Sequence, residues 1–326
     1  MNSADWTRQA ERSNAGTLRL MRGIATLCGR RATRVLLHPI TLYFMLFGGA
    51  AAHESARYLQ RALGRPARWI ERYRHLHHFA CTILDRVYLL QERFEHFDIE
   101  VQGAEHLDAV LQKGQGALLV GAHFGSFEVL RSLGQARRGL RVAMVMYEEN
   151  AQLMKHALDP LARVDTLKII ALGRVEAMLK LRDWLDTGGV AGMLADRTLP
   201  GSSQRAAGLH AASFLGDQVM FSDGPFRLAA LLRRPTLFMA GIYHGDNRYE
   251  LRFLPLEDFS ERASGARREE VLAEAVARYA AVLERLCIEA PYNWFNFFDF
   301  WAAPGVPDPH DASLDSHALA SRTFRH

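Results

Sequence analysis

The feature that most constrains the fold is an apolar run that ends in a histidine and a glycine-serine turn. Residues 117–120 are all apolar, as in a buried strand, and the strand pattern extends to His123. Gly125 and Ser126 follow, and a segment with helical periodicity begins at Phe127. A buried strand that turns directly into a helix is typical of α/β proteins, in which ligands bind where strands end. The sequence therefore predicts that His123 lies at the ligand-binding edge of a sheet.

The carboxylate of Glu128 follows His123 by five positions. Near the start of the helix it can lie beside the imidazole, hold its tautomer and raise its basicity. Gly125 between them permits a close backbone approach or a positive φ angle. We predict that His123 is a general base that removes a proton from a hydroxyl outside the enzyme, with Glu128 as its acidic partner. The alternative is a buried histidine with a structural role.

Ser126 is a weaker candidate for the nucleophile of a hydrolase. The Gly-x-Ser-x-Gly turn requires a glycine two positions after the serine, and Glu128 stands there. The pair Gly114 and Gly116 precedes its strand instead of following it, which predicts a turn and not a phosphate-binding loop. The sequence therefore favours direct base catalysis over a covalent serine intermediate.

After Phe97 the chain alternates between strand and helix patterns. The predicted strands span residues 117–123, 141–146, 168–171, 189–195, 236–243 and 249–253. The predicted helices span residues 127–135, 153–161, 175–185, 224–232 and 271–286. Residues 198–213 are predicted to form a loop, and residues 302–326 a disordered tail. This alternation predicts an α/β fold with a mixed, largely parallel sheet flanked by helices, which we place at residues 96–301.

A second candidate motif, Asp196-Arg197, ends the predicted strand 189–195. We expect it near His123 because the carboxyl ends of parallel strands share one edge of a sheet. An arginine there can clamp a phosphate or polarise a carbonyl. The alternative is a structural ion pair.

The amino-terminal region, residues 1–95, has a different character. Residues 35–52 are almost entirely apolar, and eighteen residues is a borderline length for spanning a bilayer. Arginines flank this stretch on both sides, which favours a helix lying in the membrane surface over a span. A buried helical hairpin and a cleaved signal peptide remain alternatives. Residues 73–97 are predicted as an amphipathic, membrane-proximal helical surface.

Composition excludes several classes of protein. The net charge of +4 is compatible with an acidic carrier protein or an anionic membrane, and does not indicate a nucleic-acid partner. The three cysteines lack zinc spacing and suggest no disulfide framework.

The histidines at 75, 77 and 78 point to different faces of a helix, so we predict no metal site. His210 and His244 have no identifiable partner in the sequence. The aromatic residues between 291 and 301 are expected either to line an acyl-chain groove or to pack in the core.

Together these motifs resemble the bacterial lipid A late acyltransferases, the lauroyl and myristoyl transferases of lipopolysaccharide assembly. The matching pieces are Lys113-Gly114-Gln115-Gly116, the run from His123 to Glu128, Asp196-Arg197, Phe214-Leu215-Gly216, and Pro291 with Trp294. The resemblance covers roughly residues 95–300 and implies the fold of glycerolipid acyltransferases. It also implies an enzyme on the cytoplasmic face of the inner membrane. Such an enzyme moves a fatty acyl group from acyl-carrier protein or coenzyme A to a lipid hydroxyl, without a cofactor.

The resemblance also implies roles for individual residues. His123 matches the general base of the family, Glu128 its acidic partner, and Arg197 a substrate-holding residue. We predict that Asp196, Gly125 and Ser126 also line the substrate site, and that Arg197 or backbone N–H groups at Phe127 stabilise the oxyanion.

One departure concerns the acceptor. The family usually carries a basic stretch after its carboxy-terminal tryptophan, and Asn296-Phe297-Phe298-Asp299-Phe300 stands in its place. In this respect the chain is similar to a divergent subgroup, the acyltransferases of aryl-polyene or pigment-lipid pathways, so the expected acceptor is a lipid A-like lipid, another glycolipid or a pigment lipid. The alternative functions are a thioesterase of acyl thioesters and a non-catalytic lipid-binding protein.

Overall fold

The computed structural model describes residues 23, 29–136, 140–147, 168–173, 175–197, 208–261 and 264–301. The strands are β1 (Asp98–Gln102), β2 (Ala117–Gly125), β3 (Val142–Tyr147), β4 (Lys168–Leu172), β5 (Val190–Leu194), β6 (Leu209–Phe214), β7 (Asp217–Ser222), β8 (Pro235–Gly245) and β9 (Arg248–Asp258). A helix over Gly29–Phe47 precedes α2 (Gly49–Leu63) and α3 (Trp69–Leu90). Then come η1 (Phe94–His96), α4 (Ala104–Gln112), η2 (Phe127–Leu130), α5 (Arg131–Ala136), α7 (Val175–Asp186), α8 (Gly224–Leu232) and α9 (Ala266–Glu289).

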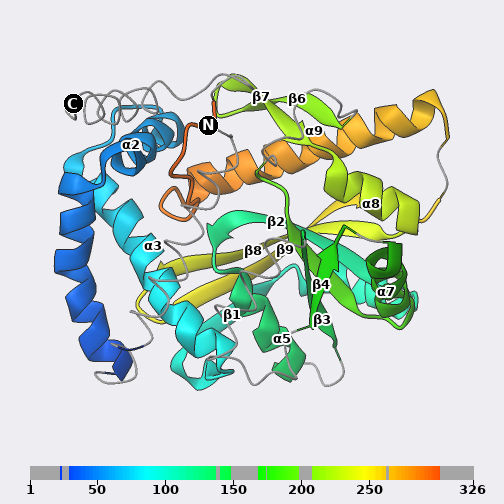
Figure 1. Cartoon of the computed structure of the whole chain (residues 1–326), viewed down its shortest axis with the longest axis horizontal. Coiled ribbons are helices and arrows are strands. Elements are labelled where there is room, and N and C mark those ends of the chain that lie inside the picture. The colour runs from blue at the N-terminus through cyan, green and yellow to red at the C-terminus, as the bar shows by residue number, and fades with distance from the viewer. Residues whose placement is uncertain are drawn as a thin grey trace, which may run out of the picture.

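A seven-stranded sheet forms the centre of the molecule, in the order β1-β9-β8-β2-β5-β3-β4 (Figure 1). Neighbouring strands in this sheet are parallel, except that β8 and β9 form an antiparallel pair. The predicted α/β class with a mixed, largely parallel sheet is therefore confirmed. β2 lies in the middle of the sheet, so its carboxyl end is flanked by strands on both sides.

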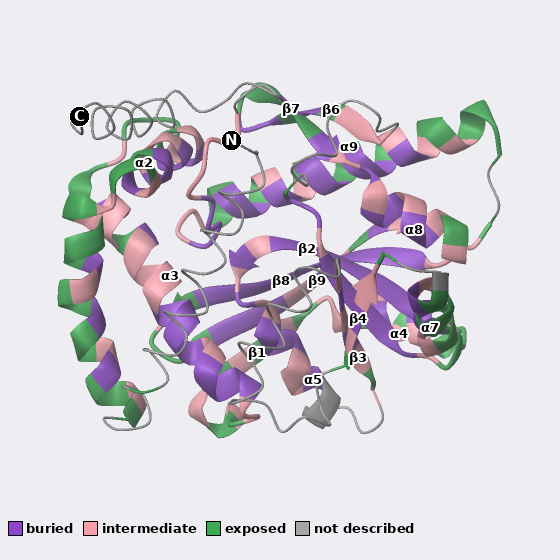
Figure 2. Ribbon diagram, in the orientation of Figure 1, coloured by how far each residue is buried: buried purple, intermediate pink, exposed green. Residues whose placement is uncertain are grey.

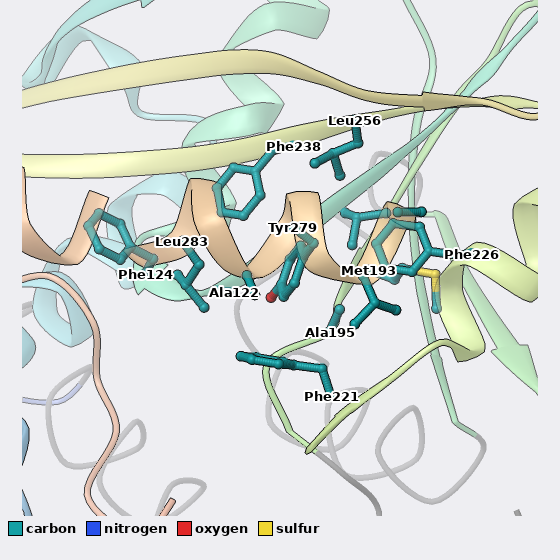
Figure 3. Packing of buried hydrophobic residues seen from close by; sticks show 14 of the residues in the cluster. Ala122, Phe124, Met193, Ala195, Phe221, Phe226, Phe238, Leu256, Tyr279 and Leu283 are labelled. Atoms are coloured by element: carbon teal, nitrogen blue, oxygen red, sulfur yellow. The ribbon is translucent and has the colours of Figure 1, made fainter. Parts of the chain in front are cut away.

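Helices cover both faces of the sheet, because consecutive residues of the central strands are apolar and point alternately to the two faces. Leu118 and Val120 of β2 belong to a core with α2, α7, α8 and α9, and Ala117 and Leu119 belong to a core with α3, α4 and α5. Figure 3 shows the first core, where Tyr279 of α9 lies among side chains from the sheet and the β6–β7 hairpin. Full burial of one such Leu or Val side chain stabilises the fold by about 1.5–3 kcal/mol.

The segment 73–97 differs from its prediction as a membrane-proximal surface. α3 lies between the Gly29–Phe47 helix and the sheet (Figure 1), and Cys81, Leu84 and Leu89 are fully buried. The second face of the sheet is apolar and requires such a cover. His75 is also fully buried, and its two ring nitrogens lie 2.8 Å from Ser55 Oγ and 2.8 Å from the Trp294 carbonyl oxygen.

Part of the predicted loop 198–213 is a strand. β6 pairs with β7 in an antiparallel hairpin, and Leu215 and Gly216 make the turn with positive φ angles of 50° and 87°. Ala212 and Phe214 of β6 are buried in the first core, which explains why this short stretch is ordered as a strand. The predicted helix 153–161 and the predicted disordered tail 302–326 lie outside the described residues.

The two amino-terminal helices meet near Gly48 at an angle of 92°. None of the described helices could cross a membrane alone, whereas this bent pair has the required length and composition. The Gly29–Phe47 helix buries Thr33, Leu37 and Thr41 and exposes large apolar side chains on its other side (Figure 2). These exposed residues are Val35, Leu36, Leu42, Tyr43, Phe44, Leu46 and Phe47. The association of this region with a membrane remains a prediction.

Candidate active site

The end of β2 carries His123 and is held from both sides by backbone contacts. Gly125 has a φ angle of 64° and faces Gly241 of β8, whose carbonyl oxygen would lie 1.9 Å from a Cβ added at position 125. Any side chain there would clash, so this turn requires glycine. On the other side, the segment after α9 returns to β2, where Phe295 N donates to the His123 carbonyl oxygen at 2.8 Å. His123 therefore stands on a fixed backbone at the carboxyl edge of the sheet.

The imidazole of His123 is paired with Asp196, the residue just beyond β5. His123 Nδ1 lies 2.8 Å from Asp196 Oδ1, and the backbone N–H of His123 donates to Asp196 Oδ2 at 3.0 Å. An ionised carboxylate can only accept, so Nδ1 carries the hydrogen and Nε2 keeps a free lone pair. The side chain of His123 is 32% exposed, whereas that of Asp196 is 2% exposed. This is the arrangement of a general base with a buried orienting carboxylate.

Asp196 is itself held by a third donor. The indole Nε1 of Trp294, which is fully buried, donates to Asp196 Oδ2 at 2.9 Å. Burial alone raises the pKa of a carboxyl, but the contacts with His123 and the charge of Arg197 hold the pKa of Asp196 well below its usual value. Asp196 therefore stays ionised while it orients the imidazole.

The electrostatic surroundings keep His123 in its neutral form. Burial lowers the pKa of the imidazole below its usual value, and the charge of Arg197 lowers it further. Asp196 acts in the opposite direction, and Arg86 of α3 adds to the lowering. A neutral imidazole is the form that can accept a proton, so the lowered pKa keeps His123 competent as a base at neutral pH.

Arg197 lies beside this pair and is anchored to the carboxy-terminal aromatic segment. Its Nη2 donates to the Phe295 carbonyl oxygen at 3.3 Å, and its guanidinium carbon is 5.3 Å from the centre of the Phe298 ring. The residue is exposed, as a group that meets a substrate must be. Its assignment to substrate binding stays a prediction.

Glu128 does not hold the imidazole, contrary to the role expected for it. One oxygen, Oε1, lies 2.8 Å from Arg86 Nε, and the other, Oε2, accepts a hydrogen bond from Ser126 Oγ at 2.9 Å. The strand ends in a 3-10 turn rather than directly in an α-helix, and this turn directs the Glu128 side chain toward α3. Asp196, and not Glu128, therefore holds the imidazole of His123.

Gly125 and Ser126 both have roles within the fold. The N–H of Gly125 donates to the Asn293 carbonyl oxygen at 2.8 Å, and that of Ser126 donates to the Gly241 carbonyl oxygen at 2.8 Å. Ser126 is buried, and its hydroxyl is engaged by Glu128, which is unfavourable for a nucleophile. Substrate binding by these two residues, and oxyanion binding by N–H groups at Phe127, remain predictions.

Two other histidines have partners that the sequence did not reveal. His244 Nε2 lies 2.9 Å from Glu250, and His210 Nε2 lies 2.8 Å from the buried Asp223. Among the described residues, His210, Asp223 and Glu269 are spaced closely enough to hold a metal ion. Arg227 donates to both of these carboxylates, however, so a cation already neutralises this group.

Sequence reasoning missed Trp294 and Arg86 as members of the site. Trp294 entered as a piece that matches the family and as part of an aromatic stretch, and no contact or role in the site was predicted for it. The aromatic segment packs mainly in the core: Trp294 and Phe295 are buried, and Phe300 and Trp301 pack against the same core. Arg86 gives no signal in the sequence, because α3 approaches η2 only through tertiary packing.

Comparison with known proteins agrees with this geometry. The family model for bacterial lipid A biosynthesis acyltransferases matches residues 76–302, which is more than half of the chain and includes every residue of the site. No curated protein matches the chain in a sequence search. The matched region extends from α3 to the segment after α9, the elements that surround His123 and Asp196. The chain belongs to the bacterial lipid A biosynthesis acyltransferase family and is an acyltransferase.

Proposed function

We propose that this enzyme transfers a fatty acyl group from an acyl-carrier-protein or coenzyme A thioester to a hydroxyl of a membrane lipid. The observation that carries the proposal is the partly exposed imidazole of His123, whose Nδ1 is held by the buried Asp196 so that Nε2 is left as the basic nitrogen. The acceptor is a lipid A-like glycolipid or a pigment lipid. The chain lacks the basic stretch that the family usually carries after the tryptophan that Trp294 matches, which favours an acceptor with fewer phosphate groups than lipid A.

In the proposed reaction, His123 Nε2 removes the proton of the acceptor hydroxyl as its oxygen attacks the thioester carbonyl carbon. Asp196 stabilises the imidazolium that forms, and Arg197 stabilises the negative charge on the carbonyl oxygen. The tetrahedral intermediate then breaks its C–S bond, and the thiolate takes the proton from His123. The products are the acylated lipid and the free thiol of the donor.

We propose that the Gly29–Phe47 helix lies in the cytoplasmic surface of the inner membrane. Its outer side exposes Phe44 and Phe47 by 54% and 71%, an unusual exposure for aromatic side chains in a water-soluble protein. Near its start Arg31 is exposed and can meet anionic lipid headgroups, whereas Arg30 and Arg34 are bound within the protein, Arg30 to Asp85 and Arg34 to Tyr243. Such a position would bring the enzyme and a soluble donor to the side of the membrane on which the lipid acceptor is reached.

Replacing both Phe44 and Phe47 by glutamate is expected to weaken binding to vesicles of phosphatidylethanolamine and phosphatidylglycerol by at least about tenfold. Burial of one aromatic side chain contributes about 1.5–3 kcal/mol, and the substitution removes two. Co-sedimentation with the vesicles measures the effect. Leu231→Glu, at a 64% exposed leucine of α8, is the control and should bind as the unmodified protein does. Equal binding of all three proteins would contradict the membrane proposal.

Labelled acyl thioesters test the reaction directly. The purified enzyme is incubated with acyl-carrier-protein and coenzyme A thioesters and with total membrane lipids, and the lipids are analysed by mass spectrometry. We expect a lipid species heavier by one acyl group, whose mass identifies both the chain and the acceptor. Release of free fatty acid without an acylated lipid would instead assign a thioesterase activity.

A further inference from the structure

The segment after α9 meets the end of β2 at Trp294, which forms an isolated antiparallel bridge with Phe124. The carbonyl oxygen of Trp294 has two further partners: it accepts from Asn296 N at 3.0 Å and lies 2.8 Å from Nε2 of His75, on α3. The first contact is local and already satisfies the carbonyl. A buried polar side chain costs free energy unless it is hydrogen-bonded, so an apolar side chain would cover this carbonyl at less cost. The contact with His75 is therefore not explained by the needs of the carbonyl alone.

His75 is held in one orientation and one tautomer. It is fully buried, and burial lowers the pKa of its imidazole to about 4, so the ring is neutral at neutral pH. A carbonyl oxygen can only accept, so Nε2 carries the hydrogen and donates to Trp294. Nδ1 is then the acceptor, and the hydroxyl of the buried Ser55, on α2, donates to it at 2.8 Å. Together α2 and α3 thus fix the donor that reaches Trp294.

The indole of Trp294 carries this support to the catalytic pair. Nε1 donates to Asp196 Oδ2 at 2.9 Å, and Asp196 Oδ1 lies 2.8 Å from His123 Nδ1. The ring of Tyr58, also on α2, packs edge-on against the indole with 5.0 Å between the ring centres. His75 contacts the backbone of Trp294 and Tyr58 contacts its side chain, so α2 and α3 reach both parts of the residue. A displacement of Trp294 would move its N–H group away from Asp196.

We propose that His75 is a positioning residue that holds Trp294 where its indole can fix the carboxylate of Asp196. Ser55 in turn keeps His75 in the tautomer that donates. This inference rests on the proposed acyl transfer. It extends the catalytic arrangement into the amino-terminal helices, because Ser55 and His75 both precede residues 76–302, which match the family model. Since His75 is fully buried, it touches no substrate and acts through Trp294.

Two amides at position 75 separate the contacts of the imidazole. In His75→Gln the amide nitrogen can occupy the place of Nε2 and donate to the Trp294 carbonyl, whereas the shorter side chain in His75→Asn reaches only the place of Nδ1. We expect His75→Asn to lower kcat by roughly 10–10²-fold with KM within about threefold, because a displacement of about 1 Å in an active site can cost about 10²-fold. His75→Gln should stay within about threefold of the unmodified enzyme. An equal loss in both variants would overturn the proposal.

Ser55→Ala tests the same arrangement with a smaller change, and it decides the question should His75→Asn fail to fold. It removes only the hydroxyl that donates to Nδ1, which leaves the imidazole of His75 free to turn or to change tautomer. We expect kcat to fall by about three- to tenfold with little change in KM, as the loss of one hydrogen bond does. A kcat equal to that of the unmodified enzyme would overturn the proposal.

The NMR resonance of the Trp294 indole N–H is a readout that needs no acceptor lipid. The chain has five tryptophans, so a nitrogen-15 spectrum of the indoles is simple, and Trp294→Phe assigns the signal. A hydrogen bond to a carboxylate moves such a proton downfield. We expect the signal to move upfield in His75→Asn and to keep its position in His75→Gln. A side chain with a merely structural role would lower the unfolding temperature without moving this signal in the folded protein.

A double variant and a matched control complete the test. If His75 acts through Trp294, adding His75→Asn to Trp294→Phe should change kcat by less than about threefold, because residues that act through one another are not additive. A further loss of about tenfold or more would overturn the proposal. His77→Gln is the control: Nδ1 of His77, on the same helix, lies 3.3 Å from Thr41 Oγ1, and its loss should move neither kcat nor the indole signal. An unmodified enzyme that transfers no acyl group refutes the proposed function. An active enzyme whose indole signal stays in place in His75→Asn refutes only the inference.

Discussion

Replacing His123 by alanine is expected to lower kcat/KM for acyl transfer by about 10²–10⁴-fold, the usual contribution of a general base. The alanine variant keeps the backbone contacts of position 123 with Asp196 and Phe295, so the edge of the sheet should stay in place. Initial rates with an acyl-carrier-protein thioester, together with a thermal unfolding curve, measure activity and folding on the same preparation.

His210→Ala is the matched control for this experiment. His210 forms the same kind of pair with a buried aspartate, Asp223 at 2.8 Å, but it belongs to the β6–β7 hairpin. Its loss should leave the rate within about threefold of the unmodified enzyme. Full activity in the His123→Ala variant would remove the base from the mechanism.

Replacing Asp196 by asparagine is expected to cost about 10²–10⁴-fold in kcat. The amide has no charge to stabilise the imidazolium, and its NH₂ group can turn toward Nδ1 and select the wrong tautomer; loss of the aspartate from a Ser-His-Asp triad costs about 10⁴-fold for this reason. Asp196 opposes the other influences that lower the pKa of His123. Without it that pKa falls further, so the acid limb of the kcat/KM profile should move to lower pH while the plateau falls.

The pH shift distinguishes loss of the charge from loss of the fold. A misfolded protein loses activity at every pH without moving the limb of the profile. Glu250→Gln, which removes the charged partner of His244, is the control and should leave both the plateau and the limb unchanged. A profile of Asp196→Asn with an unshifted limb would show that Asp196 does not act on the imidazole.

Local patterns in the sequence were sufficient to predict most of the sheet. The apolar runs that form β2, β5 and β8 are buried on both faces of the sheet. Such continuous apolar runs predict strands even when the neighbouring strands are not known. The start of α8 could also be predicted, because Asp223 precedes a glycine and a proline. The helix ends at Leu232, as predicted. β6 was missed because only Ala212 and Phe214 of its residues are buried, and this is too short an alternation to predict a strand.

The candidate site was only half predictable for a different reason. His123 and Asp196 could each be located at the end of a strand, since parallel strands share one edge. Their pairing could not be read from spacing, because they are far apart in the chain, and Glu128 at a distance of five positions was the more obvious partner. The direction of the Glu128 side chain depends on Arg86 of α3, which reaches it only after the helix has packed on the sheet.

The return of the segment after α9 to the end of β2 has a consequence for how the enzyme matures. Trp294 and Phe295 supply a hydrogen bond to Asp196 and one to the backbone of His123, so the catalytic pair is completed by residues that are synthesised after the strands β1 to β9. A nascent chain released only as far as β9 would possess the base and its carboxylate without the groups that fix them. The catalytic pair can therefore be fixed in place only after the ribosome has synthesised the segment that follows α9.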